Sequence, residues 1–428
     1  MNDTIYAEAT PPGSAGISVI RVSGPDVTSV LVKLVGKVPP PRVAHISKIR
    51  HPASSEVIDE GLILYFEPGR SFTGEAVAEF QVHGSPAVVR ATLSAIAAVD
   101  GTRPAERGEY TRRALEGGRV DLAQAEAIRD LVASTSEVQR RHSVRALSGS
   151  LARKVDDWRG SLTQALALLS ASLDFADEEV PANVWTGVAD LIVAVRSSME
   201  DEIRGASAAE RMRTGFEVAI VGPPNVGKST LLNAIARRDA ALVSPTAGTT
   251  RDVIEVAMDI DGLPVIFLDT AGLRETADTV ERMGVERAHQ RSQGADLRIV
   301  MGVPANGALL GADDILVHPK ADLGVSVRGV PVSGLTGEGI AGLLGEVSER
   351  LLERVARVGA SVTARQGEAL SRSSNALRDA EARLSDESAL DLAAVDVERA
   401  LRVCDELLGR VGIEDVLDRV FSSFCIGK

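Results

Sequence analysis

Cysteine, aromatic residues and long apolar runs are all scarce in this chain of 428 residues. Two cysteines, Cys404 and Cys425, cannot form a disulfide framework, so we expect a reducing compartment. The N-terminus has no basic segment followed by an apolar stretch, which argues against a signal peptide. No run of about 18 apolar residues occurs, so we predict no membrane helix. These absences favour a cytoplasmic protein with no membrane partner.

Aromatic residues make up only 3% of the chain against 44% hydrophobic residues, so its cores must use mainly Leu, Val, Ile and Ala. The net charge of −13 argues against a generic nucleic-acid coat, which would present a basic surface. RNA contact through a local patch stays open, because arginine and lysine cluster twice, although solvated helix faces explain such clusters equally well. The clusters are Arg103, Arg107, Arg112, Arg113 and Arg119, and Arg140, Arg141, Arg145, Arg153 and Lys154.

The pattern of elements divides the chain into domains. Residues 1–118 mix short β-like runs with turns and predict an α+β domain. Residues 119–212 and 355–428 are helical, and residues 213–354 alternate strand-like and helix-like stretches, which is typical of a parallel α/β sheet. We therefore predict an α/β plus α protein whose helical domain is split by an inserted α/β domain. Expected strands are Ile17–Val22, Leu62–Phe66, Ala78–Val82, Phe216–Val221, Val265–Leu268 and Leu297–Met301, and the expected buried helical stripe is Leu147, Leu151, Val155, Trp158, Leu162 and Leu166.

Residues Gly222 to Ser229 match the full P-loop spacing, between a predicted strand and a predicted helix. Glycines in this position let backbone N–H groups turn toward phosphates, and the helix N-terminus adds a positive pole. Lys228 would reach the β- and γ-phosphates as a catalytic residue, and Ser229 would bind Mg²⁺.

Four further motifs follow in the order of a GTPase, and two of them lie where guanine is read. Gly248 to Asp252 lie where a switch loop supplies a threonine to Mg²⁺, and Asp269 to Gly272 end a predicted strand where an Asp holds the magnesium through water. Lys320, Asp322 and Ser333 fall where guanine is read. The order favours a Ras-like P-loop G domain over an ATPase or a kinase.

Leu273 follows the Asp-Thr-Ala-Gly motif where Ras-like enzymes place a water-orienting glutamine. No arginine finger is obvious either, so another residue must orient water and another cation must offset the transition-state charge. Asn225 can offer a carbonyl oxygen to a monovalent cation.

The chain resembles the MnmE (TrmE) family. The resemblance is carried by Asp3-Thr4-Ile5, Ala9 to Gly13, Ser71 to Glu75, His83-Gly84, Asp121 to Ala127, Gly272 to Thr276, Val280-Glu281 and the terminal Phe421 to Lys428. It implies a homodimer with an N-terminal folate-binding and dimerisation domain, a helical domain and an inserted G domain. It also implies a heterotetramer with an MnmG-like FAD protein that adds a carboxymethylaminomethyl or aminomethyl group to C5 of the wobble uridine (U34) of certain tRNAs.

The resemblance assigns roles by position. K⁺ would lie among Asn225, Ser244, Thr246 and Thr249, while Ser229 and Thr250 would bind Mg²⁺. Glu281 would orient the attacking water through a second water. Arg21, Glu79, Arg119 and Lys428 would contact a tetrahydrofolate derivative, 5-formyl or 5,10-methylene, with Cys425 near it as a catalytic candidate or a buried small side chain. Together with the motifs, the predicted GTP and cation ligands are Asn225, Val226, Gly227, Lys228, Ser229, Thr230, Ser244, Pro245, Thr246, Ala247, Gly248, Thr249, Thr250, Asp269, Thr270, Ala271, Gly272, Lys320, Asp322 and Ser333.

The sequence departs from the family pattern at the guanine motifs. At these motifs, Pro319 stands where the family has Asn, and Gly334 stands where it has Ala. Outside them, Met301-Gly302 ends a strand where the family usually has Val-Asp, and Arg119 replaces a Lys at the folate position.

Two other interpretations of the function stay open: a regulatory GTPase of the Era or Der ribosome-assembly type, and a folate enzyme with a vestigial G domain.

Overall fold

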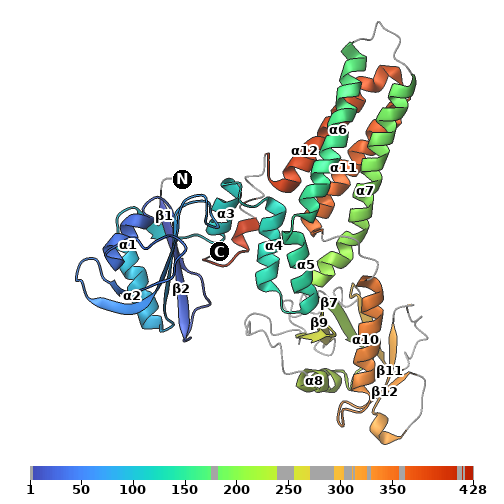
Figure 1. Cartoon of the computed structure of the whole chain (residues 1–428). Coiled ribbons are helices and arrows are strands. Elements are labelled where there is room, and N and C mark those ends of the chain that lie inside the picture. Colours follow the sequence, from blue (N-terminus) through green and yellow to red (C-terminus); the bar gives the residue numbers. More distant parts are fainter. Residues whose placement is uncertain are drawn as a thin grey trace, which may run out of the picture. The chain divides into compact units, whose positions relative to one another are not determined.

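The computed structural model describes residues 3–174, 182–238, 255–269, 294–302, 311, 314–324, 329–355, 362–411, 417 and 420–427. The chain forms two compact units, one of residues 1–129 with 405–428 and one of residues 130–404. Each unit contains one six-stranded sheet among its described residues (Figure 1). The predicted domain boundaries at 118, 212 and 354 stay predictions.

The sheet of the first unit has the strand order β3-β4-β5-β2-β1-β6. Neighbouring strands are antiparallel, except that β1 and β6 are parallel. The register pairs Arg21 of β2 with Glu79 of β5, whereas Ile20 and Val22 point to the opposite face. The strands are β1 (Thr4–Glu8), β2 (Ile17–Ser23), β3 (His45–Arg50), β4 (Val57–Phe66), β5 (Val77–His83) and β6 (Thr102–Pro104).

Two amphipathic helices, α1 (Val27–Val35) and α2 (Pro86–Ala97), cover the face of this sheet that carries Ile20 and Val22. Ser85 caps the N-terminus of helix α2, because its side chain accepts a hydrogen bond from the N–H of Ala87. Helices α3 (Glu109–Glu116) and α4 (Leu122–Ala133) follow β6. The face with Arg21 and Glu79 therefore remains for other contacts.

The C-terminal segment belongs to this first unit. Phe421 and Phe424 pack with Leu122 and Ala125 in one buried cluster, and the two phenyl rings lie 5.2 Å apart between centroids. The terminal motif is thus anchored by apolar burial rather than left as a free tail.

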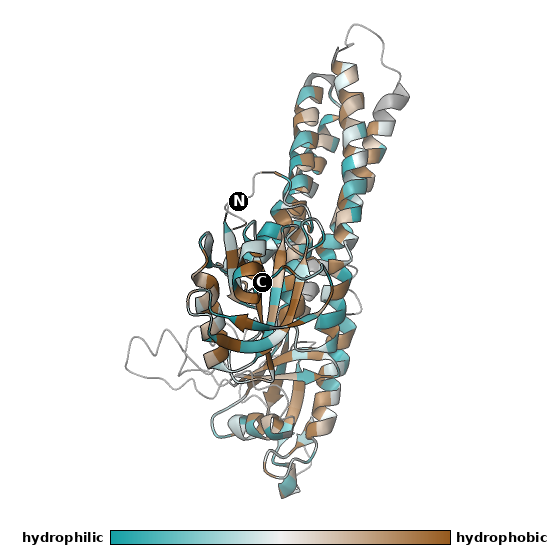
Figure 2. Cartoon of the chain, turned by 60° about the vertical axis from the view of Figure 1, so that its left-hand side comes forward, coloured by the Kyte–Doolittle hydropathy of each residue, from teal (hydrophilic) through white to brown (hydrophobic). Residues whose placement is uncertain are grey.

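The helical part of the second unit is a bundle. Helix α7 packs on α6 and on α11, and the Ser373 hydroxyl of α11 donates to the carbonyl of Ala400 in α12. Brown and teal residues alternate along these helices in Figure 2, as expected for amphipathic helices. Their bounds are α5 (Glu137–Leu147), α6 (Ser150–Asp174), α7 (Ala182–Thr214), α11 (Ala364–Arg383), η3 (Glu387–Ala389) and α12 (Leu390–Leu408).

The predicted helical stripe is correct in its middle and wrong at its ends. Val155, Trp158 and Leu162 are buried in α6, but the stripe continues through Ala165 and Leu169 instead of Leu166. Leu147 belongs to the preceding helix α5. The spacing could not show that Ser148 and Gly149 interrupt the helix. Every described helix is too short or too polar to span a membrane.

The second sheet has the order β12-β11-β10-β7-β9-β8 and is parallel except for the antiparallel pair β8–β9. The parallel sheet predicted for the G domain is therefore confirmed, with one antiparallel edge strand added. Its core consists mainly of Val, Ile, Leu, Met and Phe side chains from the strands, α8 and α10. The elements are β7 (Phe216–Val221), α8 (Lys228–Arg238), β8 (Glu255–Ile260), β9 (Leu263–Asp269), β10 (Leu297–Met301), β11 (Ile315–Pro319), η2 (Ala321–Leu323), β12 (Val330–Val332) and α10 (Ile340–Val355).

Candidate functional site

The P-loop connects the end of β7 to the start of α8 and has the backbone geometry that its sequence predicts. Gly222 has φ 156°, and a Cβ there would lie 2.6 Å from the carbonyl oxygen of Met301 in β10. Only glycine therefore lets the loop pass this close to the neighbouring strand. Asn225 and Gly227 also have positive φ, 59° and 109°. The loop leads directly into the N-terminus of α8, which suits an anion.

Lys228 is buried beneath this loop. Its ammonium group donates hydrogen bonds to the carbonyl oxygens of Gly222, at 2.8 Å, and Pro223, at 3.1 Å. Buried charges require such partners, because an unpaired ammonium away from water is costly. The lysine is thereby held next to the loop that it would serve in phosphate binding.

A pocket of roughly 290 Å³ lies beside the P-loop. It brings together the P-loop side, with Val226, Gly227 and Thr230, and the predicted guanine-reading residues Lys320, Asp322 and Ser333. The latter follow strands β11 and β12, so they meet at the carboxyl edge of a parallel sheet, where ligands bind in such folds. Other lining residues are Met301, Pro319, Leu323, Val332, Gly334 and Leu335.

The loop that begins at Ser333 is stabilised by hydrogen bonds between its own residues. Ser333 is fully buried, and its hydroxyl accepts hydrogen bonds from the backbone N–H groups of Leu335 and Thr336. Gly334 lies against the first turn of α8, where a Cβ would be 2.9 Å from the backbone nitrogen of Leu231. The departure from the family's Ala at position 334 thus has a physical reason, since the loop and the helix leave no room for a methyl group.

Pro319 lines the pocket, but His318 is not one of its lining residues. The two residues are adjacent in strand β11 and so point to opposite faces of the sheet. Within the part of the chain that the structure describes, the buried Nε2 atom of His318 has no hydrogen-bond partner. This placement disfavours the idea that His318 replaces the donor that an Asn at position 319 would provide.

Several predicted ligands lie outside the described residues, whereas Asp269 lies within them. Asp269 ends β9, and its backbone pairs with Ile220 of β7, which places it beside the strand that leads into the P-loop. Among the described residues, no group of three His, Cys, Asp or Glu side chains could hold a metal. The residues outside are Ser244, Pro245, Thr246, Ala247, Gly248, Thr249, Thr250, Thr270, Ala271, Gly272, Leu273, Glu281 and Lys428.

The first unit pairs two of the predicted folate residues. The Arg21 guanidinium donates from Nε and Nη2 to Oε1 of Glu79, at 3.1 and 2.9 Å. Both side chains are partly exposed, at 24% and 19%, so their polar groups are accessible to a ligand. Arg119 is exposed, and its side chain passes close to Gly74.

The C-terminal motif lies against the end of β1. A Cβ on Gly427 would be 2.3 Å from the carbonyl oxygen of Glu8, and Ile426 forms an antiparallel bridge with Arg107. The carbonyl oxygen of Cys425 accepts a hydrogen bond from Gly108, and its thiol is exposed. Cys425 is therefore not the buried small side chain of the alternative interpretation. The motif lies beside β1, the strand next to the one that carries Arg21.

Comparison with known proteins identifies the family. The model of the GTP-binding protein TrmE N-terminus matches residues 4–119, and the MnmE helical domain model matches residues 122–425. A tRNA modification GTPase MnmE from Cereibacter sphaeroides is 49% identical over 430 residues, and one from Paracoccus denitrificans is 50% identical over 429, with 100% of each chain covered. The chain belongs to the MnmE family. The FeoB G domain from Methanococcus jannaschii is 24% identical over 32% of this chain and 97% of that chain, with a TM-score of 0.23.

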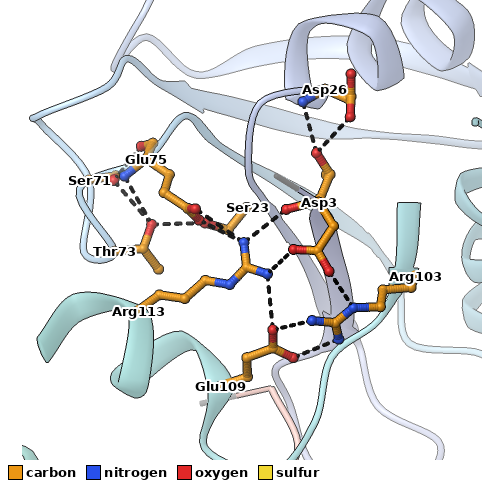
Figure 3. Close-up of polar contacts among 10 residues, drawn as sticks. Asp3, Ser23, Asp26, Ser71, Thr73, Glu75, Arg103, Glu109 and Arg113 are labelled. Atoms are coloured by element: carbon orange, nitrogen blue, oxygen red, sulfur yellow. Dashed lines mark hydrogen bonds and ion pairs between the residues drawn. The ribbon is translucent and has the colours of Figure 1, made fainter. Parts of the chain in front are cut away.

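The MnmE-family chain also contains a charged network that its sequence did not reveal (Figure 3). Arg113 is almost fully buried and donates to Asp3, Glu75 and Glu109, while Arg103 donates to Asp3 and Glu109. Asp3 and Arg113 are 110 positions apart, so no local pattern could pair them. Arg113 is thus unavailable for the RNA contact considered for its cluster.

The network shifts the titration of its acids. The hydrogen bond from Arg103 is the main cause of the lowered pKa of Asp3, opposed in part by burial. For Glu109, burial acts to raise the pKa, but hydrogen bonds from Arg103, the Glu106 backbone and Arg113 together lower it. Both carboxylates are therefore held ionised near neutral pH.

The second arginine cluster is also largely paired. Arg140 and Arg141 both form ion pairs with Glu137, and Lys154 pairs with the buried Glu202. Arg153 donates to the carbonyl of Ser148. These contacts support the interpretation of this cluster as ordinary helix-surface pairing.

Proposed function

We propose that this chain is a GTP hydrolase that acts in tRNA modification. The observation that carries the proposal is the pocket in which P-loop residues meet Lys320, Asp322 and Ser333. Its lining has P-loop residues that would bind phosphates on one side and the carboxylate of Asp322, which would bind guanine, on the other. A guanine nucleotide requires both. The family relatives, which bear the name tRNA modification GTPase over their full length, support the same activity.

In this proposal each residue around the nucleotide has a separate task. Lys228 and the loop amides bind the phosphates, and Asp322 accepts hydrogen bonds from the N1–H and amino group of guanine. Ser229 and Thr250 bind Mg²⁺, and hydroxyl and phosphate oxygens are ligands that this ion prefers. Asn225, Ser244, Thr246 and Thr249 bind K⁺, which supplies the positive charge that an arginine finger gives elsewhere. Glu281 orients the attacking water, since Leu273 has no polar group.

The first unit would bind a tetrahydrofolate derivative as the source of a one-carbon unit. Arg21, Arg119 and Lys428 would pair with its carboxylates and pterin, because guanidinium and ammonium groups form strong charge-assisted hydrogen bonds. Glu79 would accept from the pterin, and the exposed Cys425 would lie near the reacting carbon. We further propose a cytoplasmic homodimer that acts with an MnmG-like FAD protein on U34 of certain tRNAs.

The decisive experiment is nucleoside analysis of wobble uridines from cells that lack this gene. We expect the carboxymethylaminomethyl or aminomethyl modification to disappear and to return with the wild-type gene but not with Lys228→Ala. Lys33→Ala, which removes an exposed lysine of α1, is the matched control and should restore it. Unchanged uridines in the deletion strain would favour a regulatory GTPase of the Era or Der type. Full rescue by Lys228→Ala would favour a folate enzyme with a vestigial G domain.

A further inference from the structure

Helix α3 has an unusual composition for a packing element. Besides Thr111, three of its eight residues, Glu109, Tyr110 and Arg113, are polar or charged and at most 5% exposed. Burial of charge is unfavourable unless every charge is paired, and apolar residues would pack at lower cost. The contacts of these three side chains show what they hold in place.

Tyr110 holds Arg21 in two ways. Its hydroxyl donates to the carbonyl oxygen of Arg21 at 2.7 Å, and the guanidinium carbon lies 5.7 Å from the centre of the tyrosine ring. Such a distance allows a cation–π interaction. With Glu79 on the adjacent strand, Tyr110 fixes both the backbone and the guanidinium of Arg21.

Arg113 holds the loop Ser71–Glu75. Its Nη1 donates to Oε1 and Oε2 of Glu75, at 3.1 and 3.2 Å, and Glu75 also accepts from the Ser23 hydroxyl at 2.7 Å (Figure 3). Ser23 lies two residues after Arg21 on β2. The charged network thus connects α3, the loop and the strand of Arg21.

The same loop packs against the segment that carries Arg119. The carbonyl oxygen of Thr73 lies 3.0 Å from the position of a Cβ on Gly117. A Cβ on Gly74 would be 3.4 Å from Cγ of Arg119, so the arginine stem lies close to the loop backbone. A shift of the loop would therefore move Arg119.

We propose that α3 positions the two arginines of the folate site, Arg21 through Tyr110 and Arg119 through the Arg113–Glu75 pair. This inference rests on the proposed binding of a reduced folate by the first unit. Tyr110, Arg113 and Glu75 act through other residues and do not touch the ligand. Their role is to keep two cationic side chains at fixed places before the ligand arrives, which reduces the entropy lost on binding.

Two nearly isosteric variants test the proposal. Tyr110→Phe removes one hydroxyl, and Glu75→Gln removes one charge while it keeps an acceptor for Ser23. Calorimetry with 5-formyltetrahydrofolate on the full chain should show Kd raised about fivefold or more in each, the size expected for one lost hydrogen bond. Tyr65→Phe on β4 and the exposed Glu67→Gln are matched controls from the same unit and should bind as the wild type does.

Double-mutant cycles separate positioning from general loss of structure. In an Arg21→Ala background, Tyr110→Phe should have almost no further effect on Kd, and Glu75→Gln should have almost none in an Arg119→Ala background. Effects that persist in these backgrounds, or single variants that bind normally, would overturn the inference and leave the folate proposal standing. A wild-type chain that binds no 5-formyltetrahydrofolate would instead overturn the folate proposal, and this inference with it.

Discussion

Gly334 is so close to Leu231 that an added Cβ would lie 2.9 Å from the backbone nitrogen of that residue. The two residues connect the loop after β12 to the first turn of α8, and this turn continues the P-loop. The guanine side and the phosphate side of the pocket are therefore in direct backbone contact.

We predict that Gly334→Ala is harmful although Ala is the family's residue at this position. The methyl group must push the loop away from α8, and overpacking of this kind costs about 1–3 kcal/mol. Thermal unfolding and GTP titration should show a lower Tm and weaker binding. Gly345→Ala in α10, where a Cβ meets nothing within 4 Å, is the control and should stabilise by about 0.5–1 kcal/mol. Normal binding by Gly334→Ala would contradict the argument.

The G-domain motifs could be predicted because they are local in sequence. Strand β7 ends at Val221 and β10 spans Leu297–Met301, both as the sequence indicated, and Asp322 and Ser333 line the pocket with the P-loop. In the first unit the sequence does not predict β1, β3 and β6; of these, β6 has only three residues and pairs with β1 across about a hundred residues. A similar sequence separation conceals the pairing of Asp3 with Arg113, an arginine that the sequence groups with a basic cluster.

Base selection should depend on Asp322. A site built on paired hydrogen bonds rejects a base that cannot form them, so Asp322→Asn should shift preference from guanine to xanthine nucleotides. Competition titrations with GTP, XTP and ATP measure this preference, and Asp261→Asn in the exposed β8–β9 turn is the control. An unchanged preference would mean that the guanine site lies elsewhere.

Affinity should rise when the family's residue is restored at position 319. Proline has neither a side-chain donor nor a backbone N–H, whereas Asn can donate to the base. Pro319→Asn should therefore tighten GTP binding several-fold, or by about 1 kcal/mol. If affinity stays the same, Pro319 only shapes the loop, and His318→Ala then shows whether that imidazole supplies a donor after all.

Hydrolysis should require K⁺. A fixed cation at the developing charge stabilises the transition state, and a group of this kind commonly contributes about 10²-fold in rate. Turnover measured in KCl and NaCl at equal ionic strength should differ on that scale, and Asn225→Ala should reduce the difference. Equal rates in the two salts would exclude a cation in place of an arginine finger.

Removal of the water-orienting carboxylate should separate binding from chemistry. Glu281→Ala should bind GTP almost normally and lower kcat by about 10²-fold or more, because general acid–base groups contribute on this scale. Glu349→Ala on the exposed surface of α10 is the control. Wild-type turnover in Glu281→Ala would assign the water to another residue.

The charged network around Glu109 should make the first unit sensitive to acid. The ordinary pKa values of Asp3 and Glu109 are 3.8 and 4.5, and both are lowered in the folded chain. A lowered folded-state pKa adds stability that is complete above the unfolded-state value and is lost as the pH falls through the folded-state value. Stability from these groups should thus be constant from pH 7 to about pH 5 and fall below pH 4.5.

Glu109→Gln should already be less stable at pH 7, since it leaves buried Arg113 with one fewer anionic partner, and it should lose less stability on further acidification. Amide hydrogen exchange of β1, β6 and α3, corrected for the intrinsic pH dependence of exchange, reports this unit without interference from the other. Glu67→Gln, which removes an exposed carboxylate, should behave like the wild type at every pH. Parallel pH profiles for Glu109→Gln and the wild type would show that the acid sensitivity arises from other carboxylates.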